Sequence, residues 1–326
     1  MVTKDSLGAV LGVGLVVALL SGVAAPSLHS QARGPGALAE RLAAMTAVTG
    51  YEQAMVDSLL RLVPGARRDR AGNAILVLGT GSPRRLIACP LDEPGYVVGG
   101  IRDDGWLTLR RVGPAPGPLF DQQLEGQRVT AFGVVGPVPG VVAVRSTHLS
   151  RGRGSSDEPF TVDQAYLDVG ASSPAEVERL GIAILSPVAL TKRPHLYGQG
   201  LLASPVAARR GACAALAGAA MGAATASITG QTVIAFTVES RITRRGTLTL
   251  GNTLGPFAES VIVDGGDEEL GQLAEAADTT LPTDRFGRAV LWSLPRRYGG
   301  SPVETVALQD ILNLERRLAQ KIGGSR

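Results

Sequence analysis

The residues that carry most metal and redox chemistry are scarce in this sequence. Its 326 residues include 3 histidines and 2 cysteines, and aromatic residues make up 4% of the chain. Two cysteines are too few for a disulfide framework in a chain of this length, and Cys89 and Cys213 lack the Cys-x-x-Cys spacing of zinc or redox motifs. Both lie in apolar surroundings, which predicts buried thiols and leaves open whether they form a single bridge.

Lysine is scarce as well, since only Lys4, Lys192 and Lys321 occur among the 32 basic residues. Arginine supplies the rest, but a nucleic-acid surface would interleave its arginines with stacking aromatics, and the formal net charge is only +3. These features predict no nucleic-acid partner. The sequence also has no Gly-x-x-x-x-Gly-Lys-Ser/Thr loop and no Gly-x-Ser-x-Gly elbow, which excludes the common phosphate-loop and serine-hydrolase sites.

An apolar segment lies at the N-terminus. Leu7 to Ala25 has no charge and, at about 1.5 Å per residue, would form a helix about 28 Å long, close to the thickness of a bilayer core. We predict that residues 1–27 are a transmembrane anchor or signal segment and that residues 28–36 are a linker. Gly8 and Gly12 would let this helix pack against membrane-protein subunits. The globular part is then expected on the periplasmic or extracellular side of a membrane, or secreted after cleavage.

Helical and strand-like patterns alternate in the globular part. Residues 37–62 show apolar side chains at helical spacing on either side of a turn, and a long stretch of short strands rich in glycine and proline follows. Helical signals then return with buried-strand runs between them, and a helix is expected over 270–277. We therefore predict an α/β domain over 37–95 and 195–326, interrupted by an inserted all-β, barrel-like domain over 96–194.

Five segments of the globular part resemble segments of one enzyme family, in the same order. They are TAVTGYEQAMVDSLL, DRAGNAIL, LDEPGYVV, LDVGASSPAEVERLGI and PRRYGGSPVETVALQDI. The family is that of the di-zinc glutamyl and tetrahedral aminopeptidases, which includes cellulase-M-like proteins, and the resemblance spans roughly Ala37 to Ile322. It implies a mixed-sheet, zinc-exopeptidase-like sandwich of helices around a central sheet, with homo-oligomers that assemble through the inserted domain.

The resemblance also identifies where a zinc site would stand. Such enzymes hold two zinc ions with two histidines, a bridging aspartate, a second aspartate and a glutamate, and a further glutamate is the general base. Most of these positions carry other residues here: Pro90 and Gly300 for the histidines, Ala207 for the bridging aspartate, Arg241 for the glutamate ligand and Ser240 for the base. Asp264 alone matches, as the second zinc aspartate. The resemblance thus implies a chain with no metal and no other cofactor.

A second set of residues could bind a ligand in the vacated cleft. It consists of Arg241, Asp264, Asp92, Glu93 and His195. In relatives the residue that matches Asp92 orients a zinc-bound histidine, a partner that Pro90 removes here. A buried arginine such as Arg241 favours a carboxylate partner. His195 is interpreted as a structural histidine, because a lone histidine more often packs than reacts.

These observations lead to a functional prediction with two alternatives. We predict a catalytically inactive pseudo-aminopeptidase, not an enzyme, that serves as a membrane-tethered structural or binding subunit of a larger complex. The first alternative is an active exported metallo-aminopeptidase or hydrolase with a rebuilt site, in which Asp92, Glu93, Asp264 and His195 would converge. The second is a receptor for a small ligand or peptide anchored by Arg241, whereas a pair between Arg241 and Asp264 would indicate a self-neutralised, structural cleft.

Overall fold

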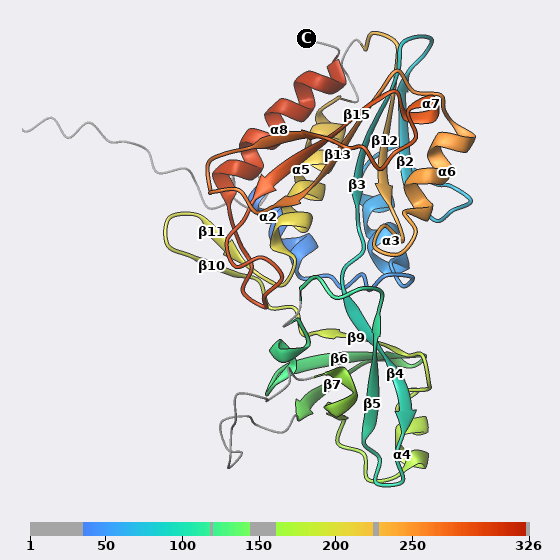
Figure 1. Cartoon of the computed structure of the whole chain (residues 1–326), viewed down its shortest axis with the longest axis vertical. Coiled ribbons are helices and arrows are strands. Elements are labelled where there is room, and N and C mark those ends of the chain that lie inside the picture. Colours follow the sequence, from blue (N-terminus) through green and yellow to red (C-terminus); the bar gives the residue numbers. More distant parts are fainter. Residues whose placement is uncertain (1–34, 118–119, 144–160, 224–227, 324–326) are drawn as a thin grey trace, which may run out of the picture.

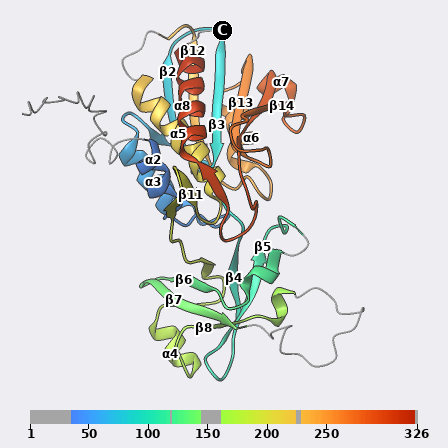
Figure 2. The same cartoon turned by 90° about the vertical axis from the view of Figure 1, so that its left-hand side faces the viewer.

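The computed structural model describes residues 35–117, 120–143, 161–223 and 228–323. Figures 1 and 2 show two domains along the long axis of the molecule, an α/β domain at one end and a β-barrel at the other. They are joined where β3 leads into β4. The predicted transmembrane or signal segment, residues 1–27, lies outside them. Among the described residues, no helix combines the length and apolar character that a bilayer span requires.

A mixed seven-stranded sheet forms the centre of the α/β domain. Its order is β1 (Arg67–Arg68), β2 (Ala74–Gly79), β12 (Gln231–Thr237), β3 (Arg84–Pro90), β13 (Glu259–Gly266), β15 (Arg288–Pro295) and β14 (Ala274–Ala277). The four strands β12, β3, β13 and β15 run parallel, so their carboxyl ends lie at one edge of the sheet, and Figure 1 shows that this edge faces the barrel. Ligands of open α/β sheets bind at such an edge.

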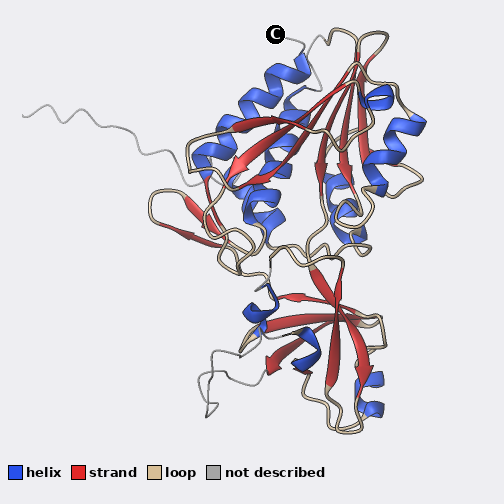
Figure 3. Cartoon of the chain, in the orientation of Figure 1, coloured by secondary structure: helices blue, strands red, loops and turns tan. Residues whose placement is uncertain are grey.

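Helices cover both faces of the sheet (Figure 3). One face carries α2 (Pro35–Ala43), α3 (Gln53–Leu62), α5 (Ala207–Ala223) and α8 (Leu308–Gly323), and the other carries α6 (Arg245–Thr253) and α7 (Thr283–Phe286). Side chains alternate between the two cores along each strand: Ile87 and Cys89 face the first group of helices, whereas Leu86 and Ala88 face the second. The predicted pair of helices within residues 37–62 is confirmed by α2 and α3.

Cys89 and Cys213 form a disulfide in the first of these cores. Their Cα atoms are 5.4 Å apart, and both side chains are fully buried. The predicted burial is therefore confirmed, and the alternative left open by the sequence, a single bridge, is the one observed. The bridge fastens the carboxyl end of β3 to the second turn of α5, so it stabilises the elements that flank the site described below.

The second domain is a closed six-stranded barrel. Its strands follow the order β4 (Gly95–Ile101), β5 (Leu107–Val112), β8 (Tyr166–Asp168), β7 (Gly136–Ala143), β6 (Arg128–Gly133) and β9 (Pro187–Leu190). Short helices η1 (Phe120–Leu124), η2 (Val162–Gln164) and α4 (Pro174–Arg179) lie between them, and apolar side chains fill the interior. The predicted α/β fold with a mixed sheet and a barrel-like insertion is confirmed; the exact domain boundaries stay a prediction.

One predicted element of the α/β domain is not observed, and one small sheet was not predicted. The helix predicted over 270–277 is wrong, because this stretch ends in β14, an edge strand that pairs with β15. Its leucine, alanine and glutamate residues favour a helix, but Gly271 has a positive φ of 93°, and Glu275 of β14 accepts a hydrogen bond from the Trp292 indole at 3.0 Å. A small sheet of β10 (His195–Tyr197), β11 (Leu201–Ala203) and β16 (Thr305–Ala307) projects from the side of the domain (Figure 1).

Candidate functional site

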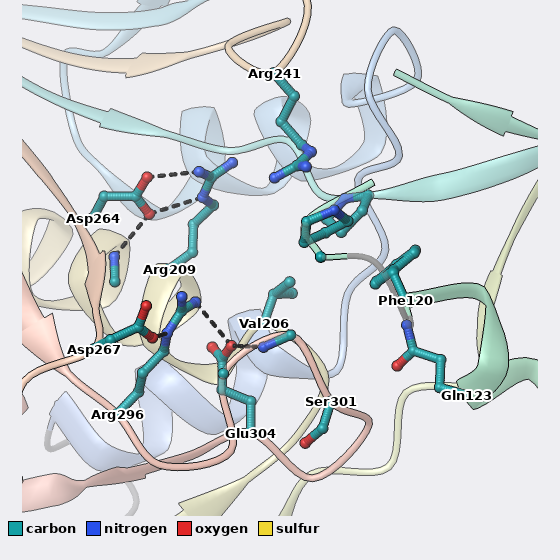
Figure 4. Close-up of a pocket in the computed structure, with 16 residues that line it drawn as sticks. Phe120, Gln123, Val206, Arg209, Arg241, Asp264, Asp267, Arg296, Ser301 and Glu304 are labelled. Carbon is teal, nitrogen blue, oxygen red and sulfur yellow. Dashed lines mark hydrogen bonds and ion pairs between the residues drawn. The ribbon is translucent and has the colours of Figure 1, made fainter. Parts of the chain in front are cut away.

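A cavity of about 620 Å³ lies between the carboxyl edge of the sheet and the barrel. Figure 4 shows its lining, which comes from both domains: Phe120 and Gln123 belong to the barrel, whereas Arg209, Asp264 and Glu304 belong to the α/β domain. A second cavity of about 460 Å³ adjoins it and shares Arg209, Arg241 and Asp264 with it. We call the two cavities together the cleft. Because the ends of several strands and the start of α5 meet here, residues distant in sequence converge on one space.

Arg209, in the first turn of α5, joins the acidic groups of the cleft. Its Nε and Nη2 donate to the two carboxylate oxygens of Asp264 at 2.8 and 2.6 Å, a bidentate pair. Its Nη1 donates to the backbone oxygen of Asp92 and lies 3.5 Å from the Asp92 carboxylate. Burial opposes the charge of Arg209, but the carboxylates of Asp264 and Asp92 outweigh it and raise the pKa of Arg209 above its ordinary value. We call Asp92, Arg209 and Asp264 the cleft network.

Asp92 is fully buried beneath the cleft and is held in one orientation. It accepts hydrogen bonds from the Thr49 hydroxyl at 2.9 Å, from the backbone N–H of Arg241 at 2.9 Å and from the Ser240 hydroxyl. Ser240 lines the second cavity, and its oxygen lies 3.4 Å from Arg209 Nη1. Asp92 therefore orients Ser240 and Arg241, both in the turn that follows β12, instead of a histidine.

Glu93, the next residue, points into a different environment. Its carboxylate accepts from Lys192 at 2.8 Å, from Arg210 at 2.7 Å and from the backbone N–H of Ala47 at 3.1 Å, and all three charged side chains are at most 5% exposed. Burial raises the pKa of Glu93, but the charges of Lys192 and Arg210 outweigh it and lower this pKa below its ordinary value. Lys192 follows β9 where the chain leaves the barrel. We call Glu93, Lys192 and Arg210 the junction network, since it joins the domains and does not line the cleft.

A third ion cluster stands at the other side of the cleft. Arg296, after β15, donates to Asp267 at 2.8 Å and to Glu304 at 3.0 Å. Glu304 is nearly fully buried and also accepts from the backbone N–H groups of Ala208 and Gly300, at 2.9 and 3.1 Å. None of these three side chains was among the predicted site residues. The signal that could have found the cluster is the position of Glu304 within PRRYGGSPVETVALQDI, one of the five segments that resemble the family.

Arg241 is the cleft arginine that lacks an acidic partner among the described residues. Its Nη2 donates to the backbone oxygen of Pro114 at 3.3 Å, and its Nε is buried without a hydrogen-bond partner there. Burial lowers the pKa of Arg241, and the charge of Arg209 lowers it further. Asp264 is paired with Arg209 instead, so the pair between Arg241 and Asp264 that would mark a self-neutralised cleft does not form.

The structure brings together most of the predicted site positions. Pro90, Ser240, Arg241 and Asp264 line the second cavity, and Gly300 lines the first. Ala207 is fully buried where α5 begins and lines neither cavity.

The residues of the predicted converging set do not share one centre. Glu93 lies in the junction network. His195 lies exposed on β10, where its ring stacks on that of Tyr197 with the ring centroids 5.9 Å apart. Asp92 and Asp264 remain, and Arg209 stands between them.

The donor set does not fit the two metal ions that the resemblance implies. Among residues 35–117, 120–143, 161–223 and 228–323, no group of three or more histidine, cysteine, aspartate or glutamate side chains could hold a metal ion. A cation between Asp92 and Asp264 would also meet the guanidinium of Arg209, which already occupies their oxygens.

Comparison with known proteins identifies the family. Residues 72–272 match the model of the M42 glutamyl aminopeptidase family. The chain is 31% identical to the Escherichia coli protein SgcX over 61% of this chain and 54% of that protein, and 33% identical to the lysyl aminopeptidase of Pyrococcus furiosus over 42% and 40%. The chain thus spans about half the length of the curated relatives it matches.

Solved structures show the same fold. The TET1 peptidase of Pyrococcus horikoshii, which can assemble into a tetrahedron or a large octahedral shell, has a TM-score of 0.79 and 22% identity over 89% of this chain and 100% of that one. The aminopeptidase APDkam598 of Desulfurococcus kamchatkensis has a TM-score of 0.74 and 20% identity over 89% and 95%.

These findings contradict the prediction of an inactive subunit that is not an enzyme. The prediction was drawn from replaced ligands alone, whereas the matching family and the named relatives are aminopeptidases, which favours the alternative of an active aminopeptidase with a rebuilt site. The physical reason for the error is that a lost ligand set excludes one mechanism and leaves the fold, the cleft and the other polar groups in place. With 201 of its 326 residues matched, counted from 72 to 272, the chain belongs to the M42 glutamyl aminopeptidase family.

Proposed function

We propose that this chain is a peptidase that hydrolyses short peptides in the cleft, with a site rebuilt around the cleft network. The observation that carries the proposal is the arrangement of Asp92, Ser240 and Arg209 beside an open cavity. A buried carboxylate accepts a hydrogen bond from a hydroxyl, and a guanidinium nitrogen stands 3.4 Å from the same hydroxyl oxygen. These are the groups that a hydrolytic step needs when no metal supplies them.

The chemistry follows from which atoms are engaged. The Ser240 hydrogen is directed to Asp92 and one lone pair of its oxygen accepts from Arg209, so the other lone pair is left to accept a hydrogen bond from an attacking water. As the water oxygen adds to the peptide carbonyl carbon, one of its protons passes to Ser240 and the Ser240 proton passes to Asp92. Arg209 stabilises the negative charge that forms on the carbonyl oxygen. When the tetrahedral species collapses, the C–N bond breaks and the leaving amine takes the proton back along the same path.

Hydrolysis of a set of di- and tripeptides by the full chain, followed by the appearance of free amines, tests this proposal. We expect turnover that persists in a chelator and that falls by about 100-fold or more in Ser240→Ala, since removing one positioned catalytic group typically costs that much. Ser172→Ala is the matched control, because the Ser172 hydroxyl also donates to a carboxylate, that of Glu176 at 2.8 Å, on the exposed surface of the barrel.

Two results would overturn the proposal. One is the absence of hydrolysis with every peptide tested. The other is hydrolysis that requires added zinc or cobalt and is unaffected by Ser240→Ala, which would mean that a metal enters despite Arg209.

We also propose that the chain is exported. The apolar segment from Leu7 to Ala25 and the disulfide between Cys89 and Cys213 support this location, because disulfides persist in oxidising compartments. Alkylation of free thiols in freshly lysed native cells, before any air oxidation, should leave both cysteines unlabelled. Labelling of both would count against export.

We further propose that copies of the chain assemble with one another through the barrel domain. The support is that solved neighbours of the same fold are oligomeric, as a dodecamer in one case. Light scattering on the purified chain should give a mass well above 33.6 kDa, and a monomer mass would exclude this assembly. A contact between Gly8 and Gly12 and membrane-protein subunits has no support from these neighbours and stays a prediction.

A further inference from the structure

The four arginines that line the cleft differ in how their charge is balanced, and Arg244 forms a neutral ion pair with Asp278 at 2.8 Å. Arg209 faces two carboxylates, those of Asp92 and Asp264, so this group carries one positive and two negative charges, a net of −1. The Arg296 cluster, with its own two carboxylates, likewise has a net charge of −1. Arg241 has no carboxylate within ion-pair distance among the described residues. The cleft is therefore polarised, with a cation on one side and surplus negative charge on the others.

The position of Arg241 is fixed, although its charge is not balanced by contact. Its backbone N–H is held by Asp92, and its Nη2 rests on the backbone oxygen of Pro114. The Nε is buried without a hydrogen-bond partner among the described residues, and Nη2 holds a backbone oxygen, so no carboxylate there engages the guanidinium. In Figure 4 the guanidinium points toward the middle of the cavity, and the dashed lines that reach Arg209 and Arg296 do not reach it.

We propose that Arg241 binds a carboxylate of the peptide substrate, which would make the cleft selective for short peptides that bring a negative charge to this point. The inference rests on the proposed function and adds the substrate class. An arginine presents paired donors that match a carboxylate, and among the described residues Arg241 is the cleft arginine with no carboxylate within ion-pair distance, so a ligand carboxylate is directed to it.

The rest of the cleft suits the other parts of such a peptide. Asp264 and Asp267 line the first cavity on the negative side, where a peptide ammonium group is attracted. Pro94, Phe120 and Val206 line the same cavity and offer apolar surface to a side chain. A volume of about 620 Å³ lies in the range of small-ligand sites, which run from about 300 to 1,000 Å³. A zwitterion of a few residues therefore matches both the charge pattern and the size.

The test is a titration calorimetry cycle with the full chain carrying Ser240→Ala, so that ligands are not consumed. Three tripeptides serve as probes: one of neutral side chains as the free acid, the same tripeptide as its C-terminal amide, and a C-terminal amide in which one residue is glutamate. Arg241→Gln is combined with each probe, Arg241→Lys tests partial rescue, and Arg128→Gln on the exposed surface of the barrel is the matched control.

We expect the free acid to bind 10- to 100-fold more tightly than its amide, as for hydrogen bonds to a charged partner. Arg241→Gln should remove this difference, whereas Arg128→Gln should keep it. Arg241→Gln and amidation of the peptide delete the same interaction, so their effects on the binding free energy are not additive. If the glutamate-containing amide binds as tightly as the free acid, the carboxylate bound by Arg241 can come from a side chain. If it does not, Arg241 binds the C-terminal carboxylate of the peptide. Both results support the assignment.

Equal binding of acid and amides, or a preference that survives Arg241→Gln, overturns it. These outcomes leave the proposed peptidase function untouched, since hydrolysis is measured separately with Ser240 present. Carboxylate-dependent binding without any hydrolysis would instead overturn the function alone.

Discussion

The junction network and the cleft network are built from neighbouring residues and behave as opposites. Asp92 and Glu93 adjoin in the chain, as do Arg209 and Arg210, yet one member of each pair turns to the domain junction and the other to the cleft. The junction side chains are at most 5% exposed, whereas those of Arg209 and Asp264 are 16% and 22% exposed. A sealed network can only hold the domains together. An open one can also meet a ligand, so the difference in exposure separates a structural role from a chemical one.

The largest expected effect removes the support that both networks share, the disulfide between β3 and α5. The double variant Cys89→Ala, Cys213→Ala should lower the free energy of unfolding by about 4 to 5 kcal/mol, the loss expected when a loop of more than 100 residues is no longer closed. The two cysteines are separated by 124 positions in the sequence. Denaturant unfolding measures this loss in the free energy of unfolding, and the reduced wild-type chain serves as a second sample. An unchanged midpoint in both would show that the bridge does not stabilise these elements.

The next effect comes from a change that affects the junction network alone. Glu93→Gln leaves Lys192 and Arg210 as buried, uncompensated cations and should lower the free energy of unfolding by about 3 to 5 kcal/mol. Glu178→Gln, on the exposed surface of α4, is the matched control and should change it by less than about 0.5 kcal/mol. Denaturant unfolding at neutral pH gives both numbers, and similar values for the two variants would contradict a structural role for the junction.

Acidification gives an independent reading of the same residue. The pKa of Glu93 is lowered in the folded chain from its ordinary value of 4.5, so the folded state binds fewer protons at this site than the unfolded state. Its contribution is therefore present above pH 4.5 and is lost as the pH falls below that value toward the folded pKa. Wild-type chain should lose more stability on acidification than Glu93→Gln, which has no carboxylate to protonate there.

Removing a residue of the cleft network should lower the free energy of unfolding by less than removing Glu93 from the junction network. Arg209→Met removes the cation between Asp92 and Asp264, but Asp264 is partly exposed and water can replace part of the lost pairing. We expect a loss of about 2 kcal/mol in the free energy of unfolding, together with a loss of peptide hydrolysis if Arg209 stabilises the carbonyl oxygen. Unfolding and hydrolysis measured on one preparation distinguish the two effects. Wild-type hydrolysis by a destabilised Arg209→Met variant would show that Arg209 does not take part in the hydrolytic step.

The sequence predicted the fold better than it predicted the site, and the residues show why. Apolar runs such as those of β3 and β13 report burial directly, and the barrel follows from short strands with glycine and proline between them. The error over 270–277 arose because β14 gains its partner from β15, which local helix propensity does not register.

The arrangement of the site depended on information that spacing along the chain does not carry. Asp92 and Glu93 look equivalent in sequence, and so do Arg209 and Arg210, but their partners come from positions about 100 residues away. Matching ligand positions identified Arg241 and Asp264 as residues of the cleft. It could not identify Arg209 as the partner of Asp264, because that pairing is set by where α5 begins relative to the end of β13.

The smallest expected effect concerns Arg241, and it sharpens the comparison most. A network residue is costly to remove because it leaves a partner unpaired, but Arg241 has no carboxylate to leave behind and its buried Nε is already unsatisfied. Arg241→Gln should therefore change the free energy of unfolding by no more than about 0.5 kcal/mol in either direction. Denaturant unfolding beside Arg209→Met checks this. A loss as large as that of Arg209→Met would mean that the scaffold depends on Arg241, whereas near-neutral stability combined with weakened peptide binding would place it at the ligand.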